Sequence, residues 1–396
     1  MSPIDELLAA AREIQPEVID LRRRIHAEPE LGLDLPATRE KVLASLEGLP
    51  LEIALHEKTS GIVATLRGGK PGRKVLLRGD MDALPMPEDT DLPFRSTREG
   101  AMHACGHDAH TAMLAGAARL LADRRDQLAG EVVFMFQPGE EGFAGARSMI
   151  EEGVLEGCEA AFALHITPIM PSGVMGTRAG ALMASADFFH VAVKGRGGHA
   201  SMPHDCVDPV PVACEIVQAM QSFITRRIPA TDPAVLTVTQ IHGGTTGNVI
   251  PEEVTLQGTL RALSEKSREL AQGGIRQVAE HVARAHGTEA QVEIMVGYPV
   301  TTNDSRAARL MLDVAREVTG GSAIEMPQPV MGAEDFSYVL NEIPGAMGFL
   351  GVRPKGEGPA APCHSNRMLL DEDGMVYGTA FHAAMAMRML ETGLPG

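Results

Sequence analysis

The stretch EVVFMFQPGEEGFAGARSMIEEG, residues 131–153, decides the fold class of this chain. An apolar run of strand composition, residues 131–137, is followed by a Pro-Gly turn and then by helical periodicity over residues 143–152. Similar β-rich runs occupy residues 61–66, 74–78 and 160–165, and helical periodicity returns at 4–27 and 107–122. This alternation predicts an α/β fold whose mixed, largely parallel sheet is covered by helices.

The pattern changes at residue 187, which indicates a second domain. Four strands and two helices are expected, at residues 189–193, 209–224, 235–241, 253–262, 265–286 and 291–296. Helices typical of the α/β part resume near residues 305–318, 333–341 and 374–390. We therefore predict a small α+β domain, residues 187–297, inserted into a catalytic domain made of residues 1–186 and 298–396.

Composition excludes several classes of partner. The 396 residues are 44% hydrophobic, enough for a large core, and the formal charge of −17 disfavours nucleic acid and anionic membranes. Five irregularly spaced cysteines disfavour a secreted disulfide framework and indicate a reducing cytoplasm. No run resembles a signal peptide or a membrane span, so a soluble cytoplasmic protein is expected.

The segment MHACGHDAHTA, residues 102–112, concentrates metal-binding side chains at the start of a predicted helix. Cys105 and His107 are spaced too closely for a structural zinc finger but suit a hydrolytic metal centre. A cysteine nucleophile with a histidine base is a second interpretation, and a buried inert cysteine is a third. Acidic surroundings would raise the pKa of a free thiol, so the metal-ligand interpretation is favoured.

Acidic residues follow the predicted strands where those strands end. Asp80 and Asp82 follow KVLLRG, Glu140 and Glu141 follow EVVFMFQPG, and His165 closes AAFALH. Ligands of open α/β sheets bind at the carboxyl ends of the strands, so these groups are expected to meet in one crevice. Two adjacent carboxylates favour a cation between them, and Asp82 is expected to orient a ligating imidazole.

Three polar residues of the inserted domain are candidates for substrate contacts. The glycine-rich stretches 195–199 and 243–248 lack a phosphate-binding pattern, so they are either simple turns or loops that present His199 and Asn248 as polar donors. Arg261, in GTLRA, suits a bidentate clamp on a substrate carboxylate.

His364, in PCHSNRM, is a candidate site residue outside the inserted domain. By itself it is ambiguous, because Cys363 offers a competing donor.

An ordered series of motifs gives the chain a specific resemblance. It is similar to the M20 metallopeptidase-like amidohydrolases, in particular the aminoacylase, hippurate hydrolase and auxin-conjugate hydrolase subgroup. The motifs are LRRRIHAEPELG, LLRGDMDALPMPE, MHACGHDAHTAMLAGAA, FQPGEEGFAGARSMIEEG, ALHITP, GRGGHAS, GNVIPEEVTLQGTLR, GAEDFSYV and CHSNRMLLDEDGM. Asp80 and Cys105 replace a histidine and an aspartate of the wider family, which agrees with this subgroup.

The resemblance implies a zinc-exopeptidase-like catalytic domain that holds two divalent metal ions, zinc or manganese, with nickel and cobalt as alternatives. It implies Glu140 as general base and acid, and a homodimer whose inserted lid domains pair and place His199 and Asn248 near the partner's active site. The implied metal ligands are Cys105, His107, Glu141, His165 and His364.

These features predict an enzyme, a hydrolase acting on the linear amide of N-acyl or N-aroyl amino acids. Glu140 would take the proton of a metal-activated water, His199 would help to stabilise the oxyanion, and Arg261 with Asn248 would hold the α-carboxylate. A metallo-dipeptidase or carboxypeptidase with the same site is the first alternative. A non-catalytic metal-binding protein is the second, although it gives Glu140 no function.

Overall fold

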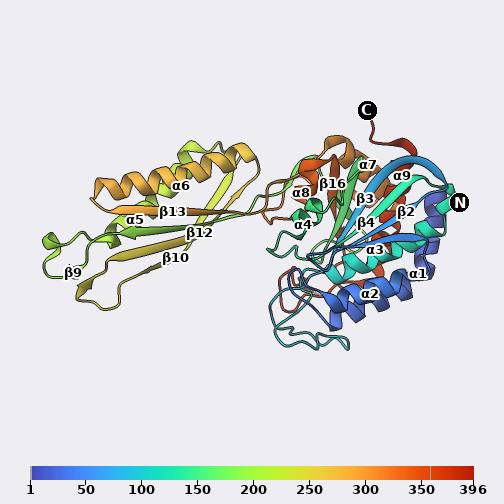
Figure 1. The fold of residues 1–396 in the computed structure, drawn as a ribbon, viewed down its shortest axis with the longest axis horizontal. Coiled ribbons are helices and arrows are strands. Elements are labelled where there is room, and N and C mark those ends of the chain that lie inside the picture. Colours follow the sequence, from blue (N-terminus) through green and yellow to red (C-terminus); the bar gives the residue numbers. More distant parts are fainter. Residues whose placement is uncertain (1, 357) are drawn as a thin grey trace. The chain divides into compact units, whose positions relative to one another are not determined.

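The computed structural model describes residues 2–356 and 358–396, which form two compact units (Figure 1). Unit 1 contains Met1–Leu182, Thr302–Gln328 and Asp335–Gly396, and unit 2 contains Met183–Thr301 and Pro329–Glu334. Within the described residues, no helix combines the length and the apolar character needed to cross a bilayer.

Unit 1 is built on an eight-stranded sheet of order β1-β2-β4-β3-β5-β16-β6-β15. The pairs β4/β3, β3/β5, β5/β16 and β15/β6 are parallel, and the other three are antiparallel. The predicted mixed, largely parallel sheet is therefore confirmed. Its strands are β1 (Leu51–Leu55), β2 (Ile62–Arg67), β3 (Lys70–Asp80), β4 (Ala129–Gln137), β5 (Ala160–Thr167), β6 (Met175–Thr177), β15 (Ala323–Glu325) and β16 (Gly345–Gly351).

Helices cover this sheet and enclose its main core. Helices α1, α3 and α9 contact one another, α3 and α9 pack on β3, and α7 packs on β16. The helix bounds are α1 (Pro3–Ala27), α2 (Pro36–Leu46), α3 (His107–Ala122), α4 (Gly145–Glu151), α7 (Ser305–Val318), α8 (Ser337–Glu342) and α9 (Met375–Thr392). Side chains from α1, α3, α7, α9 and the central strands form one buried apolar cluster, which fixes the strand ends that carry the polar residues.

Strand β16 lies in the middle of the sheet although the sequence pattern did not predict it. Its sequence, GAMGFLG, has three glycines and no β-branched residue, which gives it a low strand propensity. A Cβ on Gly345 would lie 2.2 Å from the carbonyl oxygen of Ala161 on β5. Close approach to the neighbouring strand thus requires the glycine that weakens the sequence signal. The pattern likewise did not predict α2 and β1.

Unit 2 contains a four-stranded antiparallel sheet of order β10-β12-β8-β13. Helices α5 and α6 pack on each other and on this sheet, and both lie on one side of it in Figure 1. On β8, Phe189, Val191 and Val193 are buried, whereas Phe188 is 49% exposed, so the second face is uncovered within this chain. The elements are β8 (Asp187–Lys194), α5 (Pro209–Arg227), β10 (Ala234–Gly243), β12 (Glu253–Ala262), α6 (Glu265–Ala285) and β13 (Glu289–Val296).

Short strands complete the two units. A two-stranded ribbon in unit 2 pairs β9 (Gly198–His199) with β11 (Val249–Ile250). The strands β7 (Gly180–Met183) and β14 (Thr301–Asn303) lie at the points in the sequence where one unit gives way to the other. Unit 2 has the four strands and two helices expected of an α+β domain, and its role as a lid and dimerisation domain stays a prediction.

Candidate metal centre and active site

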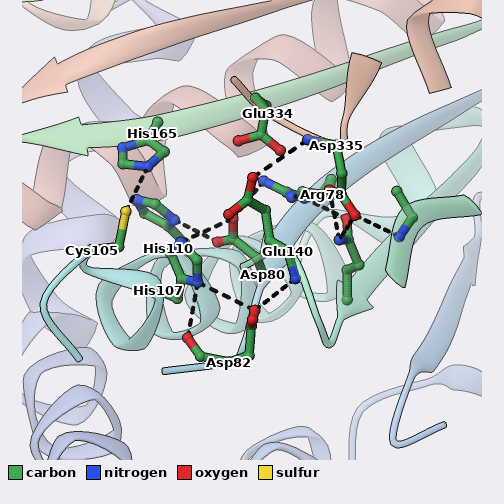
Figure 2. A network of polar contacts seen from close by, with 12 residues as sticks. Arg78, Asp80, Asp82, Cys105, His107, His110, Glu140, His165, Glu334 and Asp335 are labelled. Atoms are coloured by element: carbon green, nitrogen blue, oxygen red, sulfur yellow. Dashed lines mark hydrogen bonds and ion pairs between the residues drawn. The ribbon is translucent and has the colours of Figure 1, made fainter. Parts of the chain in front are cut away.

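The carboxyl ends of three neighbouring parallel strands bring the candidate site together (Figure 2). Strand β3 ends at Asp80, the Glu140–Glu141 turn follows β4, and His165 lies near the end of β5. Cys105 and His107 reach the same edge from the start of α3, where they lie close to these groups. The structure therefore brings these groups together at one edge of the sheet, a place called the crevice here.

The backbone conformation of Gly106 allows the side chains of Cys105 and His107 to point to the same part of the crevice. Its φ of 85° lies in the left-handed region, and a Cβ there would lie 2.4 Å from Cγ1 of Ile166. Any other residue would strain the backbone and collide with β5. Helix α3 begins at the next residue, so the His107 ring is held by the first turn of a buried helix.

His107 presents one ring nitrogen to the crevice. Its Nδ1 donates to the main-chain oxygen of Asp82 at 2.9 Å, and the Asp82 carboxylate lies farther away, at 3.4 Å. Its buried Nε2 makes no hydrogen bond to any described residue and lies 3.5 Å from Oδ2 of Asp80. This is the arrangement expected of a metal-ligating histidine that is oriented by a carbonyl behind it.

The pKa of His107 reports the electrostatics of the crevice. Burial lowers this pKa, but the negative charges of Asp80, Asp82 and Glu141 outweigh burial and raise it well above its usual range. The crevice thus takes up a proton to balance its carboxylates. A divalent cation would supply the same compensation and release that proton.

Cys105 and His165 form the opposite side of the crevice. The Nδ1 of His165 donates to the main-chain oxygen of Ile166 at 2.6 Å, which leaves Nε2 as an acceptor 3.3 Å from Sγ of Cys105. A hydrogen bond with Cys363, then burial and nearby negative charge, raises the pKa of Cys105 well above its usual range. Without a metal the thiol stays protonated, which disfavours the cysteine-nucleophile interpretation.

Asp82 holds two parts of the site in place, the His107 ring and the Glu140–Glu141 turn. Its two carboxylate oxygens accept the main-chain N–H groups of Glu140 at 2.9 Å and Glu141 at 3.0 Å. The Asp82 carboxylate therefore positions the glutamates, while its main-chain oxygen orients the imidazole. Glu140 is 6% exposed, so its carboxylate lies in a largely dry environment.

Glu141 and His364 form a pair at the edge of the crevice. Nε2 of His364 lies 3.2 Å from Oε1 of Glu141, and this contact raises the pKa of the histidine. Burial raises the pKa of Glu141, but the hydrogen bond to His364 and the charge of His107 lower it by more than burial raises it. The pKa of Glu141 is therefore below its usual value. His364 has a φ of 67°, an uncommon conformation for a residue with a side chain.

Among the groups of possible donor atoms in the described residues, three overlap at the predicted ligands and fit a metal centre. The groups are Cys105–His107–His165, His107–Glu140–Glu141 and Cys105–Glu141–His364, each with donor atoms within 4.8 Å of one another. Sulfur, imidazole and carboxylate donors together suit zinc and neighbouring transition metals. The overlap at Cys105, His107 and Glu141 suits adjacent ions that share ligands.

Asp80 and His110 are engaged in other contacts. Oδ1 of Asp80 lies 2.6 Å from Nδ1 of His110, and its Oδ2 pairs with Nη1 of Arg78 at 2.6 Å. The main-chain N–H of Ile166 donates to Nε2 of His110 at 2.8 Å, so both ring nitrogens of His110 are occupied. These contacts engage both residues, although their donor atoms also lie within 4.8 Å of those of His107.

The sequence interpretation missed the buried network behind the crevice. The carboxylate of Asp335 accepts from Arg78 at 3.0 Å, from Gln137 at 2.8 and 2.9 Å, and from the main chain of Ala146 at 2.9 Å. These contacts tie the ends of β3 and β4 to the segment before α8 (Figure 2). A usable signal was present, because Arg78 is a charge that directly follows the apolar run of residues 75–77.

His199 and Asn248 lie together in unit 2, on the β9–β11 ribbon. The main-chain N–H of Ala200 donates to the main-chain oxygen of Asn248 at 3.0 Å, and both residues are exposed. Nδ1 of His199 accepts from the main-chain N–H of Ser201 at 3.1 Å. This hydrogen bond places the ring proton of neutral His199 on Nε2, which is therefore a donor.

Arg261 lies at the other end of unit 2. It is near the end of β12, whose start at Glu253 lies next to the ribbon, so roughly 26 Å of strand separates the two places. The guanidinium is partly buried and stands 6.0 Å from the centre of the Phe188 ring. Within one chain the structure does not bring Arg261 together with His199 and Asn248.

Comparison with characterised proteins gives similarities over almost the entire chain. Thermostable carboxypeptidase 1 of Saccharolobus solfataricus is 39% identical, covering 98% of this chain and 99% of its own length. N-acetylcysteine deacetylase of Bacillus subtilis is 36% identical, with coverages of 97% and 99%. IAA-amino acid hydrolase ILR1-like 2 of Arabidopsis thaliana is 38% identical, with coverages of 95% and 87%.

A solved structure and a family model agree with these similarities. The Bacillus subtilis protein YXEP, described as a dinuclear metal-binding peptidase of family M20, matches with a TM-score of 0.84 and 34% identity. The match covers 96% of this chain and 99% of that one. The family model described as peptidase family M20/M25/M40 matches residues 76–388. This chain therefore belongs to peptidase family M20/M25/M40.

Proposed function

We propose that this hydrolase uses a dinuclear metal centre to cleave the amide bond of N-acyl or N-aroyl amino acids, releasing a carboxylic acid and a free amino acid. Its similarity to an N-acetylcysteine deacetylase and to an IAA-amino acid hydrolase supports amide hydrolysis in amino-acid conjugates. The dinuclear metal-binding relative from Bacillus subtilis supports the two-metal centre.

One observation carries the proposal, the rigid turn in which Glu140 and Glu141 stand side by side. Asp82 holds the main-chain N–H groups of both residues, and both carboxylates belong to the donor group that contains His107. Glu141 also lies with Cys105 and His364, whereas Glu140 is itself almost fully buried. One carboxylate can thus serve as a metal ligand while the other handles protons.

The residues proposed to hold two divalent ions are Cys105, His107, Glu141, His165 and His364. Zinc or manganese is the expected metal, with nickel and cobalt as alternatives. When bound, the ions would supply Lewis acidity that lowers the pKa of a water molecule toward about 7. The fit rests on the donor types and on the buried Nε2 of His107, which makes no hydrogen bond to a described residue.

The side chains then have separate parts in the proposed reaction. Glu140 accepts the proton of the attacking water and afterwards gives it to the leaving nitrogen. Nε2 of His199, whose proton is assigned by the contact with Ser201, donates a hydrogen bond to the oxyanion. Arg261 and Asn248 bind the α-carboxylate, which would select amino-acid conjugates over plain amides.

The separation inside unit 2 supports a homodimer as part of this proposal. Arg261 and Asn248 lie at opposite ends of β12 and cannot both reach one small substrate from the same chain. Two subunits could supply one residue each, and pairing of two lid domains provides a way to do so. A cytoplasmic location, expected from the cysteine pattern, stays a prediction.

A carboxypeptidase acting through the same centre is the second candidate. It is favoured by the 39% identity to a thermostable carboxypeptidase. Acetyl-, benzoyl- and glycyl-amino acids, together with N-blocked dipeptides, separate the two activities because they differ in their acyl group and free amine. Preferential cleavage of blocked dipeptides would favour the carboxypeptidase.

Chelation followed by metal add-back tests the proposed function. Apoprotein should lose hydrolysis of benzoyl- and acetyl-amino acids and regain it with about two equivalents of zinc or manganese. Binding should be followed by elemental analysis of the same samples. Full activity in metal-free protein would contradict the mechanism.

A further inference from the structure

Cys363 lies beside Cys105 without a part in the proposed reaction. Its Sγ donates a hydrogen bond to the main-chain oxygen of Cys105, with a distance of 3.9 Å. The main-chain N–H of His364 donates to the main-chain oxygen of Ala104 at 2.7 Å. The two segments that carry the cysteines are therefore held next to each other.

The two thiols differ in their relation to the metal. Cys105 belongs to two donor groups, and none of the donor groups found in residues 2–356 and 358–396 contains Cys363. A bound metal would thus engage Cys105 and leave Cys363 as a thiol. When the metal is absent, both thiols are available to each other.

Accessibility and local structure favour a reaction between the two thiols. Cys105 is buried, whereas Cys363 is partly exposed, so a small oxidant can reach Cys363 first. Cys363 lies in the irregular segment between β16 and α9, where its neighbours belong to neither a helix nor a strand. Such a segment can adjust to the specific geometry of a disulfide more easily than the start of α3 can.

We propose that Cys105 and Cys363 form a reversible disulfide in metal-free protein exposed to a peroxide, and that this bond blocks metal uptake. Hydrogen peroxide would oxidise Cys363 to a sulfenic acid and release one water. The sulfur of Cys105 would then bond to the sulfur of Cys363 while the proton of the Cys105 thiol passes to the displaced hydroxyl group, which leaves as a second water. Two thiols lose two protons and two electrons, and the peroxide receives them.

Protection by metal is the part of this inference that rests on the proposed function. Coordination would engage the sulfur of Cys105, so loaded protein should form the bond more slowly than metal-free protein. The disulfide would in turn remove the sulfur ligand that two of the donor groups contain. Oxidation and metal binding would therefore exclude each other.

Limited treatment of chelated protein with hydrogen peroxide tests the bond directly. Thiol counting in denaturant should show loss of two of the five cysteines, and tryptic mapping should show peptides 99–119 and 356–367 linked. After removal of the peroxide, zinc uptake should fall at least about tenfold and return on treatment with dithiothreitol. Absence of the linked peptide in wild-type apoprotein would overturn the inference.

Two cysteine variants sharpen the test. Cys363→Ser leaves Cys105 and the donor groups in place, so it should bind zinc before oxidation and form no linked peptide afterwards. Cys214→Ser removes an exposed cysteine of unit 2 and should behave as the wild type. Equal loss of thiols and of zinc uptake in Cys363→Ser would refute the role of the pair.

Metal-loaded wild-type protein distinguishes failure of the two proposals. If the link forms in apoprotein but not in loaded protein, both proposals are supported. If it forms equally fast in the two samples, Cys105 is not a metal ligand and the proposed centre fails, while the disulfide itself is supported.

Discussion

The crevice of unit 1 and the β9–β11 ribbon of unit 2 carry polar residues in opposite ways. Glu140 and His107 are buried. Asp82 holds the main chain of Glu140 and the ring of His107 by hydrogen bonds. His199 and Asn248 are exposed and, within the described chain, are held mainly by local contacts of the ribbon. The crevice is therefore preorganised by its own chain, whereas the polar residues of the ribbon are exposed, and their part in a site rests on the proposed dimer.

The largest expected effect is loss of turnover in Glu140→Gln. The amide cannot accept the proton of water, so kcat should fall by about 10³-fold or more while bound metal stays nearly unchanged. The measurements are kcat on a benzoyl-amino acid and metal content by elemental analysis. Glu141→Gln is the matched control and should lose metal as well as turnover; surviving turnover in Glu140→Gln would mean that the base is misassigned.

Substitution of His199 tests whether the ribbon contributes to catalysis from the other subunit. His199→Ala removes the proposed oxyanion donor and should lower kcat by roughly 10²-fold, with metal content unchanged. Refolded or coexpressed mixtures of His199→Ala with Glu140→Gln should regain about a quarter of wild-type activity, because hybrid dimers hold one intact site. No recovery in verified hybrid dimers would show that each chain uses its own His199.

Asp82→Asn tests how far preorganisation of the crevice matters. Asparagine keeps one acceptor oxygen but turns an NH₂ group toward one of the two main-chain N–H groups that Asp82 now accepts. Metal affinity should fall by about 10-fold to 100-fold, as measured by competition with a chromophoric chelator. Unchanged affinity would show that the acidic turn holds its shape without this carboxylate.

The smallest expected effect concerns substrate selection by Arg261. Loss of a charge-assisted contact in Arg261→Ala should reduce kcat/KM for acyl amino acids by about 30-fold, or about 2 kcal/mol. The corresponding acyl amino-acid amides lack the carboxylate and should change little. Equal losses on acids and amides would contradict the clamp, and Arg261→Lys should recover part of the activity on acids.

Much of the fold could be predicted from the sequence because local patterns and burial agree. Helix α3 begins at His107 and ends at Ala122, as its periodicity indicates, and β12 spans residues 253–262 as predicted. Strand β16 could not be predicted because its glycines serve close packing against β5 and not local propensity. The helix expected from residue 333 begins at Ser337, after Asp335 has entered the buried network.

The sequence alone determined which chemical groups this protein carries and the order in which strands deliver them. Thiol, imidazole and adjacent carboxylates at strand ends indicate a hydrolytic metal centre, since the carboxyl ends of parallel strands meet at one edge. Only the tertiary structure decided which contacts each of these groups makes. Arg78 pairs with Asp80, and the main chain of Ile166 donates to His110. Cys363 lies beside Cys105. Such pairings depend on contacts between residues far apart in the chain, and local sequence patterns do not encode those distances.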